Sequence, residues 1–184
     1  FDLAWKFGEK VDLNFGARAE QTNRETKYKE SGSFDDPFII KKVNKIDILP
    51  SLNVKYALND NSNLRFAGSK TITRPVIMEA YPLEFVNPDG TIEQGNTNIK
   101  NSENINFDLK YEIFPTAKEL FVVGAFSKFI QNPIERVFIP SAGSGGQIIS
   151  YDKSKKALWL GAEIEFWFQL EKISKSLQDL SFGL

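Results

Sequence analysis

The alternation of apolar and polar residues over long stretches is the feature that most constrains the fold of this chain. In NFDLKYEIFP, residues 106–115, Asp108, Lys110 and Glu112 fall on one side, and the residues between them are apolar. A period of two residues is that of a β-strand, whose successive side chains point to opposite faces of a sheet. One face of such a strand therefore needs an apolar medium, and the other needs water.

The same alternation recurs elsewhere in the sequence, and each of these segments predicts a half-buried strand. The segments are residues 11–20, 48–58, 63–73 and 157–170. In the last of them, Glu163 and Glu165 share the polar side with Gly161. Residues 120–130 differ, because both sides are apolar except for Ser127 and Lys128. This pattern predicts a strand that is buried on both faces.

The connecting segments are of two kinds, which alternate along the chain. Short polar connectors, typical of hairpin turns, occupy residues 8–10, 59–62 and 115–118. Long connectors occupy residues 24–44, 75–102 and 140–153. If consecutive strands pair, all short turns lie at one end of the sheet and all long loops at the other. Residues 171–179 then form a further short-end connection, as a helical turn or a polar turn, before LSFGL starts another strand.

Sorted connectors and long strands are typical of outer-membrane barrels, which have short periplasmic turns and longer extracellular loops. Their strands need about 9–11 residues to cross the bilayer. We therefore predict an all-β, antiparallel up-and-down meander that forms part of a transmembrane β-barrel. Two alternatives stay open at this point: a soluble β-sandwich or lipocalin-like binding module, and a passive porin-type barrel.

The composition excludes several classes of function. The chain of 184 residues contains no cysteine and no histidine, so it lacks the usual zinc ligands and the usual nucleophile–base pairs. We therefore expect no enzyme, no metal site and no cofactor. The net charge of −1 gives no bulk attraction to nucleic acid, and no nucleic-acid partner is expected.

Two sets of residues are candidates for function. The loop at 75–102 combines aromatic, amide and acidic side chains that suit a sugar or a chelate at an extracellular mouth, and the loop at 140–153 is a second candidate. The candidates in the first loop are Tyr81, Phe85, Asn87, Asp89, Glu93, Gln94 and Asn96. Tyr81 and Phe85 are equally compatible with pinning the loop to the rim. The candidates that face a lumen are Asp108, Lys110, Glu112, Glu163 and Glu165.

Several segments together resemble a known family. DILPSLNVKYALNDNSNLRFAGSKTITRP, residues 47–75, resembles the "LPSLNxKY", short turn and "NLRxAxSxTxxRP" of TonB-dependent receptors. Residues 95–115 are similar to the family's "GNPxLKPExSxNxDLxxEYF", although Thr97 and Asn101 stand where proline is usual. Residues 122–137 and 155–166 are similar to its next two strands. The similarity is to the subgroup common in Bacteroidetes-like bacteria.

The resemblance implies an active importer of the outer membrane, with a barrel of about 22 strands, an N-terminal plug and a TonB box. Residues 1–184 would be a partial barrel of about seven strands plus the start of an eighth, without plug or TonB box and not active alone. The implied partners are outer-membrane lipid, the TonB complex through other parts of the protein, and a nutrient such as an iron chelate, cobalamin or glycan.

Overall fold

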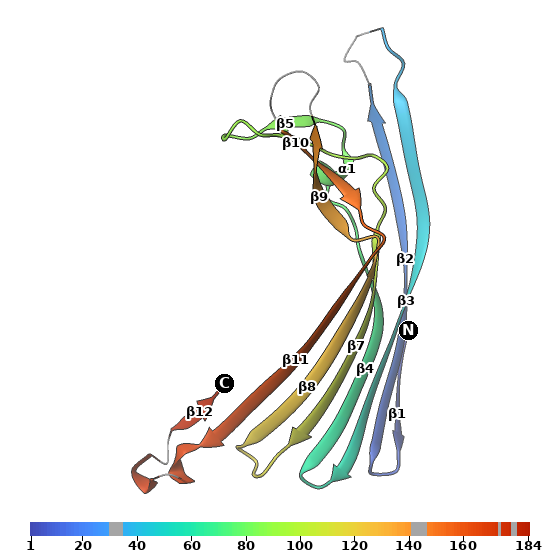
Figure 1. The fold of residues 1–184 in the computed structure, drawn as a ribbon. Helices are drawn as coiled ribbons and strands as arrows, with labels where there is room; N and C mark the ends of the chain where they lie inside the picture. The colour runs from blue at the N-terminus through green and yellow to red at the C-terminus, as the bar shows by residue number, and fades with distance from the viewer. Residues whose placement is uncertain (30–34, 141–146, 173, 178–179) are drawn as a thin grey trace.

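The computed structural model describes residues 1–29, 35–140, 147–172, 174–177 and 180–184. Its main element is a wall of eight strands in which every neighbouring pair is antiparallel (Figure 1). In sheet order the strands are β1 (Asp2–Phe7), β2 (Val11–Tyr28), β3 (Ile39–Asn59), β4 (Ser62–Thr73), β7 (Ser102–Ile113), β8 (Leu120–Gln131), β11 (Lys156–Gln169) and β12 (Ser181–Gly183). This order confirms the predicted meander and the short strand at its end.

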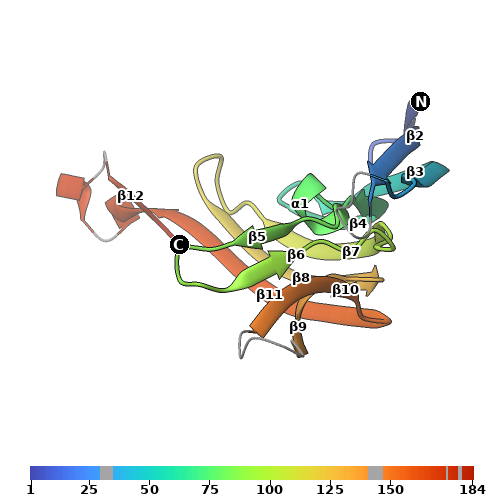
Figure 2. The same cartoon turned by 90° about the horizontal axis from the view of Figure 1, so that it is seen from above.

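A second, smaller sheet stands at one end of the wall. Its order is β5 (Glu84–Val86), β6 (Ile92–Gln94), β10 (Gln147–Lys153) and β9 (Ile134–Pro140). The short helix α1 (Ile77–Ala80) precedes it in the chain. This sheet stands above the wall strands (Figure 1) and overlaps β8 and β11 in the view from above (Figure 2). We call it the loop sheet, because both of its halves come from long connections.

The short connections have the turn chemistry that tight hairpins require. Gly8 adopts a φ of +62° between β1 and β2, a conformation that L side chains rarely adopt. The Asn59 side chain accepts a hydrogen bond from the backbone N–H of Asn61 at 2.9 Å between β3 and β4. These turns and the β7–β8 turn lie at the lower end of the wall, and the long connections lie at the upper end (Figure 1). The predicted sorting of connectors is confirmed.

The strand register places the alternating residues on two continuous faces. Phe66 pairs with Leu109 on β7, and Leu109 pairs with Ala125 on β8, so one row of the sheet is apolar. One residue further along β4 and back along β7, Ala67 pairs with Asp108, and the side chain of Asp108 lies on the other face. A shift of one residue in the pairing of two strands would move the apolar side chains of one strand to the polar face. The two continuous faces therefore depend on the register of every strand pair.

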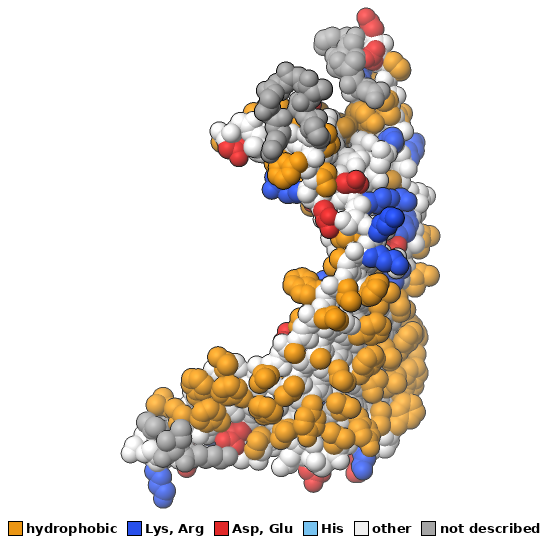
Figure 3. Space-filling model, viewed as in Figure 1, with side chains coloured by type: hydrophobic (Ala, Val, Ile, Leu, Met, Phe, Trp, Pro, Cys, Tyr) orange, Lys and Arg blue, Asp and Glu red, His pale blue; other side chains and the backbone are white. Residues whose placement is uncertain are grey.

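The apolar face has no cover in the part of the chain that the structure describes. The buried apolar residues of the described chain lie elsewhere: Leu49 and Val122 are on the opposite face of the wall, and Ala80, Ile99 and Ile149 are in the segments above it. By contrast, Leu109 is 47% exposed and Leu160 is 65% exposed. Hydrophobic side chains cover the lower part of the wall, and charged side chains gather mainly above it (Figure 3). Such a band is unfavourable in water and favourable against lipid tails.

The length of the strands also fits a lipid bilayer. β7 has 12 residues, which correspond to about 40 Å along the strand. At the tilt of roughly 40° that membrane barrels adopt, the strand would span about 30 Å, the thickness of the hydrocarbon core. Among the described residues, no helix is long and apolar enough to cross a membrane.

The prediction that residues 120–130 are buried on both faces is wrong in part. Along β8, Phe121, Val123 and Phe129 are exposed on the apolar face, with exposures of about 40%. The other face is apolar for a local reason: Phe126 covers Gly161, its partner on β11. A Cβ atom on that glycine would lie 2.3 Å from the Phe126 ring, so a glycine is needed for this close approach.

The predicted long loop at 24–44 is also wrong for most of its length. β2 continues to Tyr28 and β3 starts at Ile39, so these strands extend far above the rest of the wall as a two-stranded hairpin (Figure 1). Residues 30–34 lie outside the described residues. The hairpin escapes detection because water and polar groups contact both of its sides, so Lys41 and Lys42 can follow one another and the alternation disappears.

The other long connections contain more structure than the sequence indicates. The segment 75–102 contains α1, β5 and β6, and residues 147–153 form β10. Residues 141–146 of the predicted loop at 140–153 lie outside the described part of the chain. The connection after β11 contains two short 3₁₀ turns, Leu170–Lys172 and Lys175–Leu177, at the end of the wall that carries the short turns.

A charge on the apolar face should be costly, and a charge on the polar face should not. We expect Leu109→Arg to lower the free energy of unfolding of the full-length protein in lipid by about 2–4 kcal/mol. Ala67→Arg, which places the same side chain beside Asp108, should change it by less than about 1 kcal/mol. The measurement is reversible urea unfolding in lipid vesicles. Equal losses for the two variants would contradict a lipid-facing Leu109.

Candidate functional site

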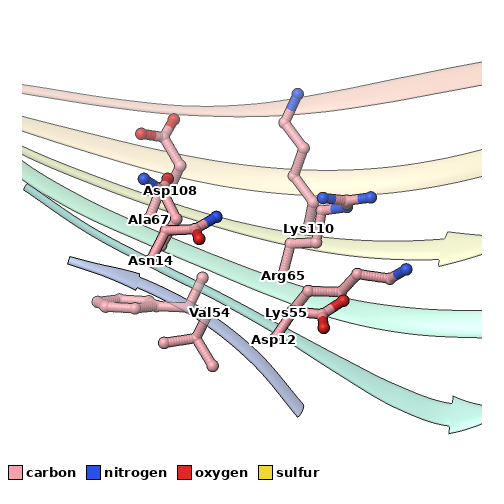
Figure 4. A pocket seen from close by; sticks show the side chains of 10 residues that line it. Asp12, Asn14, Val54, Lys55, Arg65, Ala67, Asp108 and Lys110 are labelled. Atoms are coloured by element: carbon pink, nitrogen blue, oxygen red, sulfur yellow. The ribbon is translucent and has the colours of Figure 1, made fainter. Parts of the chain in front are cut away.

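The polar face of the wall carries a row of charged side chains that crosses six strands. The register aligns Asp12 on β2, Lys55 on β3, Arg65 on β4 and Lys110 on β7, and continues through Gly124 to Glu163 on β11. Asp12, Lys55, Arg65 and Lys110 line one hollow with Asn14 and Asp108, and Figure 4 shows their side chains on the same side of the strands. The hollow has a volume of about 420 Å³.

Ion pairs connect members of this row to one another and to the next row. Arg65 Nε donates to Glu112 Oε2 at 2.7 Å, and Lys110 Nζ lies 3.8 Å from Glu163 Oε2. Glu165 instead accepts a hydrogen bond from Trp167 Nε1 at 3.2 Å. Because these pairs are largely solvent-exposed, each adds little stability. Their main effect is to keep charged groups of both signs at a wet surface.

The register places all five residues predicted to face a lumen on this polar face. Glu112 is opposite Val122, which is opposite Glu165, and the adjacent rows hold Lys110 with Glu163 and Asp108 with Phe126. The structure therefore brings these residues onto one surface. That this surface lines a lumen stays a prediction.

The seven loop candidates do not form one cluster. Glu93 and Asn87 lie together, because the Asn87 amide donates to Thr91 Oγ1 at 3.0 Å and to Glu93 Oε2 at 3.5 Å. Asp89 accepts two hydrogen bonds from Thr91, which close the turn between β5 and β6. Phe85 and Gln94 are half-buried strand residues of the loop sheet.

Tyr81 and Asn96 hold the loop in place by contacts to distant segments. The Tyr81 hydroxyl donates to the backbone carbonyl of Lys27 at 3.1 Å, which ties the loop to β2. The Asn96 side chain donates to the carbonyl of Tyr151 at 2.9 Å, which ties it to β10. Neighbouring Gly95 has no room for a Cβ atom, which would lie 2.2 Å from the carbonyl oxygen of Tyr81. Both side chains therefore hold the loop in place. A contact of either residue with a ligand stays a prediction.

A polar cluster in the loop sheet joins groups that sequence analysis did not connect. The Tyr151 hydroxyl donates a hydrogen bond to Glu93 Oε1, and Arg136 Nη2 lies 3.7 Å from the same oxygen. The bond from Tyr151 holds the pKa of Glu93 below its ordinary value of 4.5. Burial, together with the adjacent Glu93 carboxylate, raises the pKa of Tyr151 to about 12. The cluster therefore binds β6, β9 and β10 together at neutral pH.

A second hollow, the upper groove, opens between the β2–β3 hairpin and residues 97–101, and has a volume of about 650 Å³. Lys41 and Lys42 fall in the predicted long connector at 24–44, and the groove was not predicted. The residues that line it are Arg24, Lys41, Lys42, Val43, Asn44, Lys45, Thr97, Asn98, Ile99, Lys100, Asn101, Glu103 and Asn132.

Among the described residues, no group of three or more acidic, histidine or cysteine side chains could hold a metal ion.

The geometry agrees with a comparison with known families. The sequence profile of the outer membrane protein beta-barrel family matches residues 1–182. The chain belongs to this family. It is a protein of the bacterial outer membrane, and the wall is part of an outer-membrane barrel. The soluble sandwich and lipocalin-like alternatives are therefore wrong, because in the described residues lipid rather than a second sheet must cover the apolar face.

Solved structures share this fold at low sequence identity. The siderophore receptor PirA from Pseudomonas aeruginosa is 16% identical, with a TM-score of 0.60 over 92% of this chain and 38% of that one. The hemophore receptor HasR of Serratia marcescens, solved with its hemophore HasA and heme, is 13% identical, with a TM-score of 0.67 over 90% of this chain and 30% of that one. The copper transporter OprC is 17% identical, with a TM-score of 0.70 over 92% of this chain and 26% of that one. The chain thus spans well under half the length of each. A search of curated protein sequences found no match.

Because the chain has no cysteine, single cysteines can report on the two faces of β7. We expect Asp108→Cys and Lys110→Cys to react with a charged, water-soluble thiol reagent roughly tenfold faster than Leu109→Cys and Tyr111→Cys, because lipid disfavours the reactive thiolate. Labelling in isolated outer membranes, read by mass spectrometry, measures the rates. Equal rates at alternate positions would contradict the assigned faces.

Glu93 should make the loop sheet sensitive to acid. Its pKa is lowered in the folded protein, so its stabilising contribution is complete above pH 4.5 and is lost as the pH falls through its folded pKa. We expect hydrogen-exchange protection of β5 and β6 to fall in this range in the native protein, and to be lower and less dependent on pH in Glu93→Gln, which keeps Asp89 in the β5–β6 turn. Glu84→Gln, an exposed position on β5, is the control and should behave as the native protein.

Proposed function

We propose that this chain forms part of the wall of a TonB-dependent receptor, which imports a scarce nutrient across the outer membrane. Further strands of the same protein would pair with the outer edges of β1 and β12 and close the barrel. A plug would fill the lumen, and the polar face, with Lys110, Glu163 and Glu165, would contact it. In this proposal the chain has no enzymatic activity, and its partners are lipid, the TonB complex and the cargo.

The observation that carries the proposal is the charged row on the polar face beneath a structured set of extracellular loops. A wall that only enclosed a packed core would have an apolar inner face, whereas this face holds charged residues of both signs and ion pairs that require water or a polar plug. The loop sheet and the upper groove stand at the end where cargo would arrive. The similar structures are named as receptors or as a transporter, which supports the same role.

The nature of the cargo and the subgroup belong to the same proposal. We infer a nutrient too large or too scarce for diffusion, such as an iron chelate, cobalamin or a glycan. We also assign the chain to the Bacteroidetes-like subgroup, on the resemblance of residues 47–75 and 95–115.

Energy dependence tests this function. We expect cells that lack the gene to lose a growth advantage when iron, cobalamin or a complex glycan is limiting, and to regain it from the full-length gene only when TonB is present. A protonophore should abolish uptake of the labelled nutrient in complemented cells. Uptake that persists without TonB, together with steady ion conductance of the purified protein in planar bilayers, would indicate a passive porin and overturn the proposal.

A further inference from the structure

The upper groove has an excess of positive charge that the described protein does not neutralise. Five cationic residues line it, Arg24, Lys41, Lys42, Lys45 and Lys100, against one carboxylate, Glu103. Two of the lysines have acidic partners. Lys42 Nζ lies 3.1 Å from Glu25, and Lys45 Nζ lies 2.8 Å from Asp47 and 2.7 Å from Glu103.

The other three cations have no ion pair in the described part of the chain. Arg24 Nη2 donates to the carbonyl of Ile99 at 3.3 Å, and Lys41 Nζ donates to Asn98 Oδ1 at 2.8 Å. Lys100 has no ion pair among the described residues. Each of these groups keeps donor capacity for an acceptor in the groove, because an ammonium has three N–H donors and a guanidinium has five. Like charges held close together favour the binding of an anion.

A second feature of the groove is a donor without an acceptor. The side-chain nitrogen of Asn101 is buried and has no hydrogen-bond partner in the described residues. A buried donor left unpaired is costly, and a ligand oxygen would remove the cost. Asn101 adjoins Lys100 in sequence and lines the same groove, so a rotation of its side chain would bring this buried donor to a ligand beside Lys100.

The strand register shows from which side a ligand would arrive. On β2, Arg24 has the same parity as Asp12 of the charged row, and on β3, Lys41 has the same parity as Lys55. The two cations therefore belong to the polar face, above the apolar band that contacts lipid. A soluble molecule that approaches from outside would meet them before it reached the charged row.

We propose that the upper groove binds a soluble polyanion with two or more carboxylate or phosphate groups, held mainly by Arg24, Lys41 and Lys100. Resting on the proposed import function, this assigns an anionic class of cargo to the receptor and makes the groove its first binding site. Arg24 is suited to a bidentate contact with one acidic group, and the two lysines to a second. The donor of Asn101 adds a neutral contact.

The test is direct binding to the purified full-length protein in detergent, with tripolyphosphate and citrate as probes and calorimetry as the readout. We expect binding that weakens as salt is raised, and an affinity about tenfold lower in the double variant Lys41→Gln, Lys100→Gln. The variant Lys41→Arg, Lys100→Arg keeps the charges and should retain most of the affinity. Lys153→Gln removes an exposed lysine at the same end of the wall but outside the groove, and should bind as the native protein does.

Several results would overturn this site. They are no binding of either anion at low salt, equal affinity in the glutamine double variant and the native protein, or equally tight binding of neutral maltotriose. Binding of lipid A vesicles without binding of the soluble anions would assign the groove to a lipid headgroup instead. Anion binding does not need energy, so a protein that imports through TonB but binds no anion would keep its proposed function and lose only this site.

Discussion

The antiparallel hydrogen-bond ladder between neighbouring strands is the constraint on which the rest of this structure depends. In hydrocarbon no water can satisfy a backbone N–H or C=O, so each strand that crosses must pair along its whole length. Once Phe66 is opposite Leu109 and Leu109 opposite Ala125, the parity of every other residue in these strands is determined. One ladder thereby produces both the apolar face toward lipid and the charged face opposite it.

Beyond the bilayer the same hydrogen-bond ladder continues, but the side chains no longer face lipid. The β2–β3 hairpin keeps pairing up to Tyr28 and Ile39, but there its two faces meet water and protein rather than lipid. Charged residues can then occupy consecutive positions, and segments 97–101 can pack against one side. The loop sheet uses pairing in another way. β6 pairs with β10 in parallel, and the contacts of Glu93 and Asn96 to Tyr151 reinforce this pairing. Two connections separated by a whole β-hairpin thus form one unit.

The parts of the structure that could be predicted are those in which the residue pattern of one strand indicates which of its faces meets an apolar medium. The alternation around Asp108 and around Glu163 predicted both the strands and the side on which these residues lie. Turn residues such as Gly8 and Asn59 predicted the tight hairpins. The prediction for residues 120–130 was wrong in part because Phe126 packs over Gly161, a cross-strand contact that the pattern of one strand does not contain. The upper groove could not be predicted, because its cations and Asn101 come from segments more than 50 residues apart.

By itself the sequence determined the strands, their two faces and the sorting of the connectors, since these follow from a period of two residues and from local turn chemistry. It also carried a family resemblance, of which the match over residues 1–182 shows the coarser part, an outer-membrane β-barrel. Only the tertiary structure decided which connections fold into a second sheet, which acids have partners, and where cations without an acidic partner among the described residues gather. The physical reason is that alternation is a property of one strand and its medium, whereas a site requires contacts between segments that only the completed sheet brings together.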